Sequence, residues 1–345
     1  MKQEKLPFLG VFLVQGRDEA LEEVVIIGAG PCGISTAIEC KKQGFQPLII
    51  EKGCLVNSIY HYPLSMHFFS TPDNLEIGGV PFISIHDKPS RHEALNYYRT
   101  VARLHRLRIR TYEQVTRLEK ITDGFRLSTK NRMGEQEIIA RHVVIATGYY
   151  DQPHWMNVPG EDLPHVYHYF HDAHPYADQR VVVIGGRNSA IDVALDLQQV
   201  GADVTMVYRQ QAFHPSVKAW VKPVIESAIE KERIHMYWSA HVLEIQEEHV
   251  VIKQGNEIIE VPADVVFAMT GYRPSLELVK QVGAQIDEKL GVPLLTESME
   301  TTISGLYLAG VVASGHDSTK IFIENGRYHG EKIVADVKRK QQINH

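Results

Sequence analysis

The chain reads Val24-Val25-Ile26-Ile27-Gly28-Ala29-Gly30-Pro31-Cys32-Gly33 near its start, and this stretch decides the fold. The four β-branched residues predict a buried parallel strand. The glycines that follow have G-x-G-x-x-G spacing, and residues 34–39 continue in a helical pattern. A strand, a glycine turn and a helix in this order predict the first unit of a Rossmann-type domain.

Each glycine of this turn has a predicted role. Gly28 allows the tight turn, Gly30 lets the backbone approach a pyrophosphate, and Gly33 lets the helix pack close to the strand. A second strand ends at Glu51, about 20 residues later, where an acid can bind ribose hydroxyls. The predicted cofactor-binding residues of this unit are Gly28, Gly30, Pro31, Gly33, Glu51 and Lys52.

The turn recurs in degraded form farther along the chain. The apolar run 181–184 leads into Gly185, Gly186, Arg187, Asn188 and Ser189, and a helical stretch follows over 191–199. These five residues are predicted to bind a second dinucleotide. Arg187 stands where the second glycine normally lies, so its side chain either crowds a pyrophosphate or turns to bind it.

The strand after this second turn, 203–208, ends without an acid. Arg209 follows it instead. Arg209 can pair with a 2′-phosphate, which favours NADPH over NADH, or it merely caps a strand end in solvent.

Two later strands end in similar ways. Residues 141–148 form an apolar strand ending in Ala-Thr-Gly at Gly148, and residues 265–271 repeat that plan up to Gly271. A strand that ends at Gly310 and Val311 and a helix over 321–339 are predicted to close the chain. This order predicts an α/β protein with one dinucleotide-binding domain inserted into another: an extension over 1–22, a first domain over 23–160 and 275–345, and a second domain over 161–274.

Composition excludes several classes of protein. The chain has 345 residues, 44% of them hydrophobic and 23% charged, which is typical of a globular protein. Its net charge of -6 predicts no nucleic-acid partner. No apolar run is long enough to span a bilayer, so no membrane association is predicted.

Three cysteines, Cys32, Cys40 and Cys54, form no Cys-x-x-Cys pair, which favours the reducing cytoplasm and excludes a disulfide scaffold or zinc site. Cys32 lies at a predicted helix N-terminus, where the helix dipole lowers a thiol pKa. The two negative charges of a bound pyrophosphate would oppose that effect. Position alone therefore favours a small residue fitted into a turn. Cys40 is predicted to lie in the core, and Cys54 has no predicted role.

Two further clusters leave alternatives open. His165, His168, His171 and His174 recur every three residues, but no carboxylate or cysteine set completes a metal shell, so an interdomain linker is favoured. The aromatic residues of 60–63 and 68–69 either pack on a cofactor ring or fill the core.

The two turns, the two Gly-terminated strands and the late Leu-Tyr-Leu-Ala-Gly run together resemble two-dinucleotide-domain flavoprotein reductases, the thioredoxin reductase group in particular. The resemblance implies an FAD domain built from the first and last segments and an NADPH domain in the middle. The chain departs from that group in two ways. It has no redox-active Cys-x-x-Cys, and Val311 stands where an Asp normally contacts the flavin ribityl chain.

A narrower set of motifs is similar to the YpdA-type flavoproteins, which are bacillithiol-disulfide reductases. The motifs are residues 30–33, 51–52, 56–60, 185–190 and 308–311. The resemblance implies FAD, NADPH, a low-molecular-weight disulfide as oxidant, Cys32 as the redox thiol and association into homo-oligomers. The alternatives are a ferredoxin or flavodoxin NADP reductase, a flavin monooxygenase and a non-catalytic redox sensor.

Overall fold

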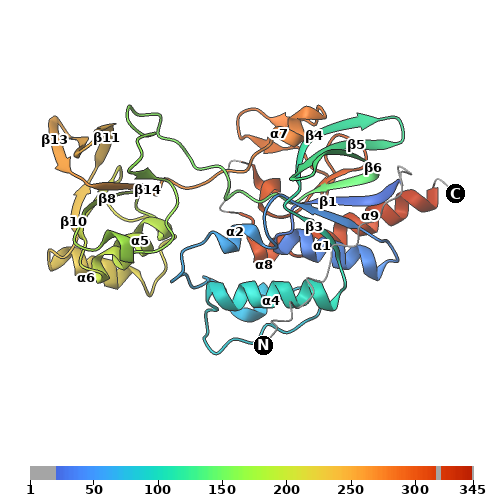
Figure 1. Ribbon diagram of the computed structural model, residues 1–345, viewed down its shortest axis with the longest axis horizontal. Coiled ribbons are helices and arrows are strands. Elements are labelled where there is room, and N and C mark those ends of the chain that lie inside the picture. The colour runs from blue at the N-terminus through green and yellow to red at the C-terminus, as the bar shows by residue number, and fades with distance from the viewer. Residues whose placement is uncertain (1–20, 316–319, 344–345) are drawn as a thin grey trace, which may run out of the picture.

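The strands form two main sheets in the computed structural model, which describes residues 21–315 and 320–343 (Figure 1). The first sheet has the order β3-β2-β1-β6-β5-β4, with β17 paired to β6. Its strands are β1 Glu22–Ile27, β2 Leu48–Glu51, β3 Arg108–Thr111, β4 Gln114–Ile121, β5 Gly124–Asn131, β6 Gly134–Ile145 and β17 Leu306–Leu308. The second sheet has the order β10-β9-β8-β14-β7, with β7 Val166–Tyr167, β8 Arg180–Ile184, β9 Asp203–Tyr208, β10 His235–Trp238 and β14 Val265–Ala268.

Strand β17 returns the chain to the first sheet. It follows the whole second sheet in sequence, yet its Leu306 pairs with Val143 of β6. Strand β6 serves two sets of neighbours, since its first half pairs antiparallel with β5 and its second half pairs parallel with β1 and β17. The segment that forms the second sheet is therefore inserted in the sequence between β6 and β17 of the first sheet, which confirms the predicted fold class.

Helices and two small sheets complete the two lobes seen in Figure 1. The first lobe holds α1 Pro31–Lys42, α2 Asn57–Tyr60, α3 Pro72–Leu75, α4 Arg91–Leu104, α7 Glu277–Gln281, α8 Ile323–Gly326, α9 His329–Ile343, the 3₁₀ turn η2 Gly310–Ser314 and the pair β15 Ile286–Asp287 and β16 Val292–Pro293. The second lobe holds α5 Asn188–Gln199, α6 Lys222–Glu230, η1 His174–Tyr176 and the antiparallel sheet β11 Ala240–Ile245, β12 His249–Gln254 and β13 Glu257–Pro262.

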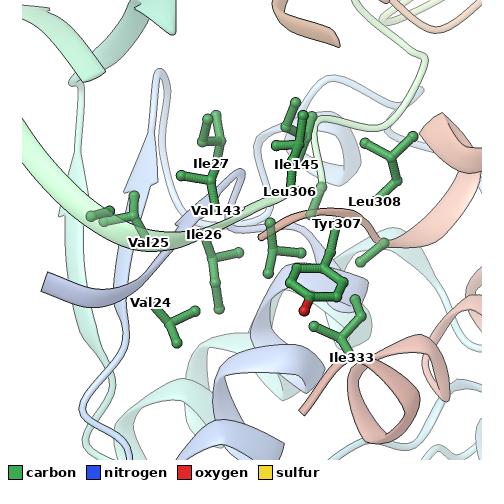
Figure 2. Close-up of a cluster of buried hydrophobic side chains, with 14 of the residues drawn as sticks. Val24, Val25, Ile26, Ile27, Val143, Ile145, Leu306, Tyr307, Leu308 and Ile333 are labelled. Carbon is green, nitrogen blue, oxygen red and sulfur yellow. The ribbon is translucent and has the colours of Figure 1, made fainter. Parts of the chain in front are cut away.

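Each lobe has its own core. Figure 2 shows the buried side chains of β1, β6 and β17 packed with Ile333 of α9 in the first lobe. The fully buried run Val24–Ile26 confirms the strand that the sequence predicted, and Cys40 lies in this core, as predicted. A separate cluster around Val183, Val204 and Phe267 fills the second lobe.

Three boundaries differ from, or go beyond, the predictions. The helix predicted over 321–339 is interrupted at residues 327–328 between α8 and α9, where the carbonyl of Arg327 accepts a hydrogen bond from Ser35 Oγ at 2.7 Å. The predicted extension lies outside the described residues up to residue 20, and Glu22 already belongs to β1. Met156 and Val158 pack against the core of the second lobe, although the predicted boundary at 160 assigns them to the first domain.

Candidate functional site

A cavity of about 1040 Å³ lies along the carboxyl ends of β1, β2, β6 and β17 and reaches α5 of the second lobe. This is the edge of a parallel sheet at which ligands bind in doubly wound folds. The predicted site residues that line it are Gly28, Gly30, Pro31, Cys32, Glu51, Lys52, Gly148, Asn188, Ser189, Gly310 and Val311. Those outside its lining are Gly33, Gly185, Gly186, Arg187, Arg209 and Gly271.

The first glycine turn is tight at both ends and open in the middle. Gly28 has φ +109°, and a Cβ there would lie 2.5 Å from the carbonyl oxygen of Ala146. A Cβ at Gly33 would lie 2.1 Å from the carbonyl oxygen of Gly28. A Cβ at Gly30 would meet nothing within 4 Å. The cavity therefore has free space beside Gly30, where α1 begins and presents its unpaired N–H groups, and this fits a phosphate group.

Glu51 ties the turn to the end of β2. Its Oε2 accepts a hydrogen bond from the N–H of Ala29 at 2.8 Å, and its Oε1 accepts one from the N–H of Gly53 at 2.9 Å. Burial raises the pKa of this carboxyl, and the two backbone N–H groups lower it. Since a carboxylate has about four lone-pair sites, Glu51 can still accept ribose hydroxyls. The neighbouring Lys52 pairs with Asp151 at 2.8 Å.

Cys32 is packed against backbone that comes from the far end of the chain. Its Sγ would lie 2.9 Å from a Cβ at Gly310 and 2.9 Å from a Cβ at Gly326, so only glycine fits at either position without a shift. Burial raises the pKa of Cys32 to about 12. This effect is opposite in sign to the helix-dipole effect considered from the sequence, and it leaves Cys32 in the thiol form at neutral pH.

The other Gly-terminated strands reach the cavity too. Gly148 has φ +71° and follows β6, and Gly310 has φ +76° and opens η2. The N–H of Gly310 donates to Nδ1 of buried His329 at 3.2 Å. Burial lowers the pKa of His329 to about 4, so its imidazole stays neutral and remains an acceptor for that N–H.

The second glycine turn is closed rather than open. A Cβ at Gly185 would lie 2.5 Å from the carbonyl oxygen of Met269, and one at Gly186 would lie 2.3 Å from the ring of Tyr208. Arg187 is exposed, and its Nη2 lies 3.2 Å from Nε2 of His214. Of the predicted residues of this turn, only Asn188 and Ser189 reach the cavity.

Arg209 and Gly271 lie outside the cavity, and both are exposed. Arg209 directly follows β9, and it has no ion-pair partner among the described residues. Gly271 belongs to the return linker, where its carbonyl accepts the N–H of His154 at 2.8 Å. This hydrogen bond joins the two segments that link the lobes.

The four histidines His165, His168, His171 and His174 do not form a common metal site in the described part of the chain. His165 Nε2 lies 3.1 Å from the carbonyl oxygen of Gln246, whereas buried His168 has both ring nitrogens without a hydrogen bond and lies 3.7 Å from Glu161. Across residues 21–315 and 320–343, no group of three or more His, Cys, Asp or Glu side chains could hold a metal ion. These histidines lie in the stretch that opens the second lobe.

The sequence reasoning missed a cluster of tyrosines between the lobes. Tyr150 lies at the centre, with ring centroids 4.9 Å from Tyr62, 5.2 Å from Tyr169 and 4.5 Å from Tyr272. The two linkers meet here through a bridge between Pro153 and Tyr272. The sequence signals were the Tyr149-Tyr150 pair directly after Gly148 and Tyr62 in the aromatic stretch 60–63. The sequence did not decide whether the aromatic residues of 60–63 and 68–69 fill the core or face a cofactor. Among them, Phe68 is buried and Tyr62 lines the cavity.

Comparison with known proteins gives three relevant likenesses. A family model described as pyridine nucleotide-disulphide oxidoreductase matches residues 25–310. The chain is 45% identical over 323 residues to bacilliredoxin reductase Bdr of Bacillus subtilis, covering 93% of this chain and 98% of that protein. It is 46% identical to the solved bacillithiol disulfide reductase Bdr (YpdA) from Bacillus cereus, with a TM-score of 0.91 and coverage of 92% of this chain and 99% of that chain.

A more distant structure shares the fold alone. A thioredoxin reductase of Lactococcus lactis superposes with a TM-score of 0.72 at 21% identity, covering 92% of this chain and 98% of that one. Among the described helices, none is long and apolar enough to cross a membrane.

Proposed function

The chain belongs to the pyridine nucleotide-disulphide oxidoreductase family, and from this premise we propose that it uses NADPH and FAD to reduce bacillithiol disulfide, a low-molecular-weight thiol disulfide. The near full-length likeness to a bacillithiol disulfide reductase carries the proposal. When bound, FAD would supply the chemistry of accepting a hydride and passing two electrons to a disulfide.

The residues around the cavity suit such a cofactor. We propose that the open turn at Gly30 and the start of α1 bind the pyrophosphate, and that Glu51 binds the ribose beside it. The backbone of Gly310 and Val311 and the buried hydroxyl of Thr147, which has no hydrogen-bond partner, would face the remainder of the cofactor. Asn188 and Ser189 would face the nucleotide of NADPH, with Arg209 placed to bind its 2′-phosphate.

Cys32 is the proposed thiol for attack on the substrate. Its Sγ would form a bond to one sulfur of the disulfide and release the other as a thiolate. Two electrons, which NADPH would supply through bound FAD, together with two protons would then break the mixed disulfide and release the second thiol and the Cys32 thiol. Attack requires the thiolate, which the pKa of about 12 disfavours. Cys32 lines the cavity, so a disulfide bound there would reach the residue from the cavity side.

The acceptor decides among the alternatives. NADPH oxidation by the FAD-loaded enzyme should be fastest with bacillithiol disulfide, compared with glutathione disulfide, ferredoxin and oxygen. Turnover only with ferredoxin, or only with oxygen and an organic substrate, would identify a ferredoxin reductase or a monooxygenase. Flavin reduction without turnover on any acceptor would identify a redox sensor.

The same assay tests Cys32. We expect Cys32→Ser to lose about a hundredfold or more of the rate of disulfide reduction. We also expect the wild-type rate of thiol exchange to rise about tenfold per pH unit between pH 7 and 9, because the thiolate fraction rises so below the pKa. An unaffected Cys32→Ser would reject this mechanism while leaving the function in place.

The likeness to bacilliredoxin reductase favours bacilliredoxin as a second candidate acceptor. Substituting bacilliredoxin for the small disulfide in the same assay compares the two directly. A larger kcat/KM for bacilliredoxin would make the small disulfide the secondary substrate.

Location and assembly are further parts of the proposal. All three cysteines are free thiols, which supports the cytoplasm. The family resemblance supports a homo-oligomer, which sedimentation of the holoenzyme measures. The net charge of -6 supports the absence of a nucleic-acid partner.

A further inference from the structure

The cavity has a second end, away from Glu51, where the two lobes meet. Residues 62–70 run from α2 toward the second lobe (Figure 1). Ser65 Oγ donates to a carboxylate oxygen of Asp196 in α5, and the N–H of Leu64 donates to the carbonyl of His171 at 2.9 Å. We call this region the interlobe end, and its lining includes His67, Phe69, His86, Lys88, Lys218 and Trp220.

The carboxylates at the interlobe end are already engaged. Asp192 pairs with buried Lys218 at 2.8 Å, and Asp196 accepts the Ser65 hydroxyl. Lys88 has no carboxylate within ion-pair distance in the described part of the chain. Its Nζ lies instead 5.3 Å from the ring centroid of Trp220 and 5.8 Å from that of Phe69. An unneutralised ammonium is thus held between the lobes of a chain whose net charge is -6.

The aromatic rings and imidazoles around Lys88 complete a site for an anion. Phe69 and Trp220 are 53% and 49% exposed, and their rings lie 5.4 Å apart. Exposed aromatic residues beside a cavity are typical of binding sites. His67 and His86 lie with ring centroids 6.0 Å apart. Nδ1 of His67 lies 3.0 Å from the carbonyl oxygen of Ser65 and donates to it, which leaves His86 as the ring that can donate to a ligand.

We propose that the interlobe end binds the carboxylate groups of an acidic disulfide substrate, with Lys88 as the cation and His86 as a hydrogen-bond donor. This inference rests on the proposed disulfide reductase function and adds its substrate class. The rings of Phe69 and Trp220 orient Lys88 by cation–π contact and cover the carbon chain of the substrate.

NADPH is the other anion that could use Lys88. Its phosphates already have two candidate cations, Arg187 and Arg209, at the second glycine turn. Both lie outside the cavity lining, whereas Lys88 comes from the first lobe and lines the cavity. Asn188 and Ser189, proposed to face NADPH, line the same cavity from the second lobe. We assign Lys88, which comes from the opposite lobe, to the disulfide, and the KM of NADPH tests that choice.

The test compares disulfides of opposite charge. Steady-state KM values are measured for bacillithiol disulfide and glutathione disulfide, which carry carboxylates, and for cystamine, which carries only amines. The FAD-loaded wild type is compared with Lys88→Gln and Lys88→Arg. Lys253→Gln is the matched control, since Lys253 is an exposed lysine on β12 of the second lobe, and neither it nor its strand partners His241 and Ile258 line the cavity.

We expect Lys88→Gln to raise the KM of the acidic disulfides about fivefold and to leave or lower that of cystamine. Lys88→Arg should restore most of the affinity, and Lys253→Gln should match the wild type. Equal KM values in wild type and Lys88→Gln would overturn the inference but not the function. The inference would also be overturned if Lys88→Gln raised only the KM of NADPH, or only the KM of bacilliredoxin used as the acceptor. A wild type that reduces no disulfide would overturn the function and, with it, this inference.

Discussion

At the scale of single residues, Gly30 and Gly33 are glycines for different reasons. A Cβ at Gly30 meets open space at φ −76°, whereas one at Gly33 would lie 2.1 Å from a carbonyl oxygen. We expect Gly30→Ala to keep the unfolding midpoint of the FAD-free protein but to weaken FAD binding about tenfold or more. We expect Gly33→Ala to destabilise the FAD-free protein by about 3 kcal/mol. Thermal unfolding and a fluorescence titration with FAD measure the two effects. Wild-type FAD affinity in Gly30→Ala would contradict the proposed pyrophosphate position.

At the scale of elements, a polar network docks α9 on the first sheet. Asp336 accepts a hydrogen bond from Tyr307 Oη at 2.8 Å and pairs with Lys340 at 2.9 Å. Burial would raise the pKa of Asp336, but hydrogen bonds from Lys340, Arg339 and Tyr307 lower it to about 2. The stability that the ionised carboxylate contributes is therefore present above pH 4 and lost as the pH falls toward 2. We expect Asp336→Asn to cost about 1–2 kcal/mol at pH 7 and progressively less below pH 4, measured by urea unfolding. A cost that does not change with pH would contradict this role of the charge.

At the scale of the whole molecule, two lobes with separate cores meet at one cavity. We propose that the second domain begins near residue 155, because Met156 and Val158 pack on its core. A fragment over 155–274 should unfold cooperatively and bind NADPH but not FAD. The matched fragment over 161–274 should be about 2 kcal/mol less stable, because it loses the burial of those two side chains. Equal urea midpoints for the two fragments would place the boundary at 161.

Much of the fold was readable from the sequence because its signals are local. The buried strand at Val24–Ile27, the turn at Gly28 and the strand over 203–208 each depend on neighbours a few residues away, and the structure confirms them. The helix predicted over 321–339 is confirmed in most of its length, but it is interrupted at residues 327–328, where Ser35, distant in sequence, donates a hydrogen bond to the carbonyl of Arg327. Local pattern carries no information about such a contact.

The sequence by itself determined the paired glycine turns, the inserted sheet and the family. It could not determine the surroundings of Cys32, whose pKa depends on Gly310 and Gly326 folding back over its sulfur. Nor could it place Lys88 beside Trp220, since the two lie in different lobes. Backbone conformation follows from short-range sterics and periodicity, whereas desolvation and charge pairing depend on which distant side chains the fold brings together.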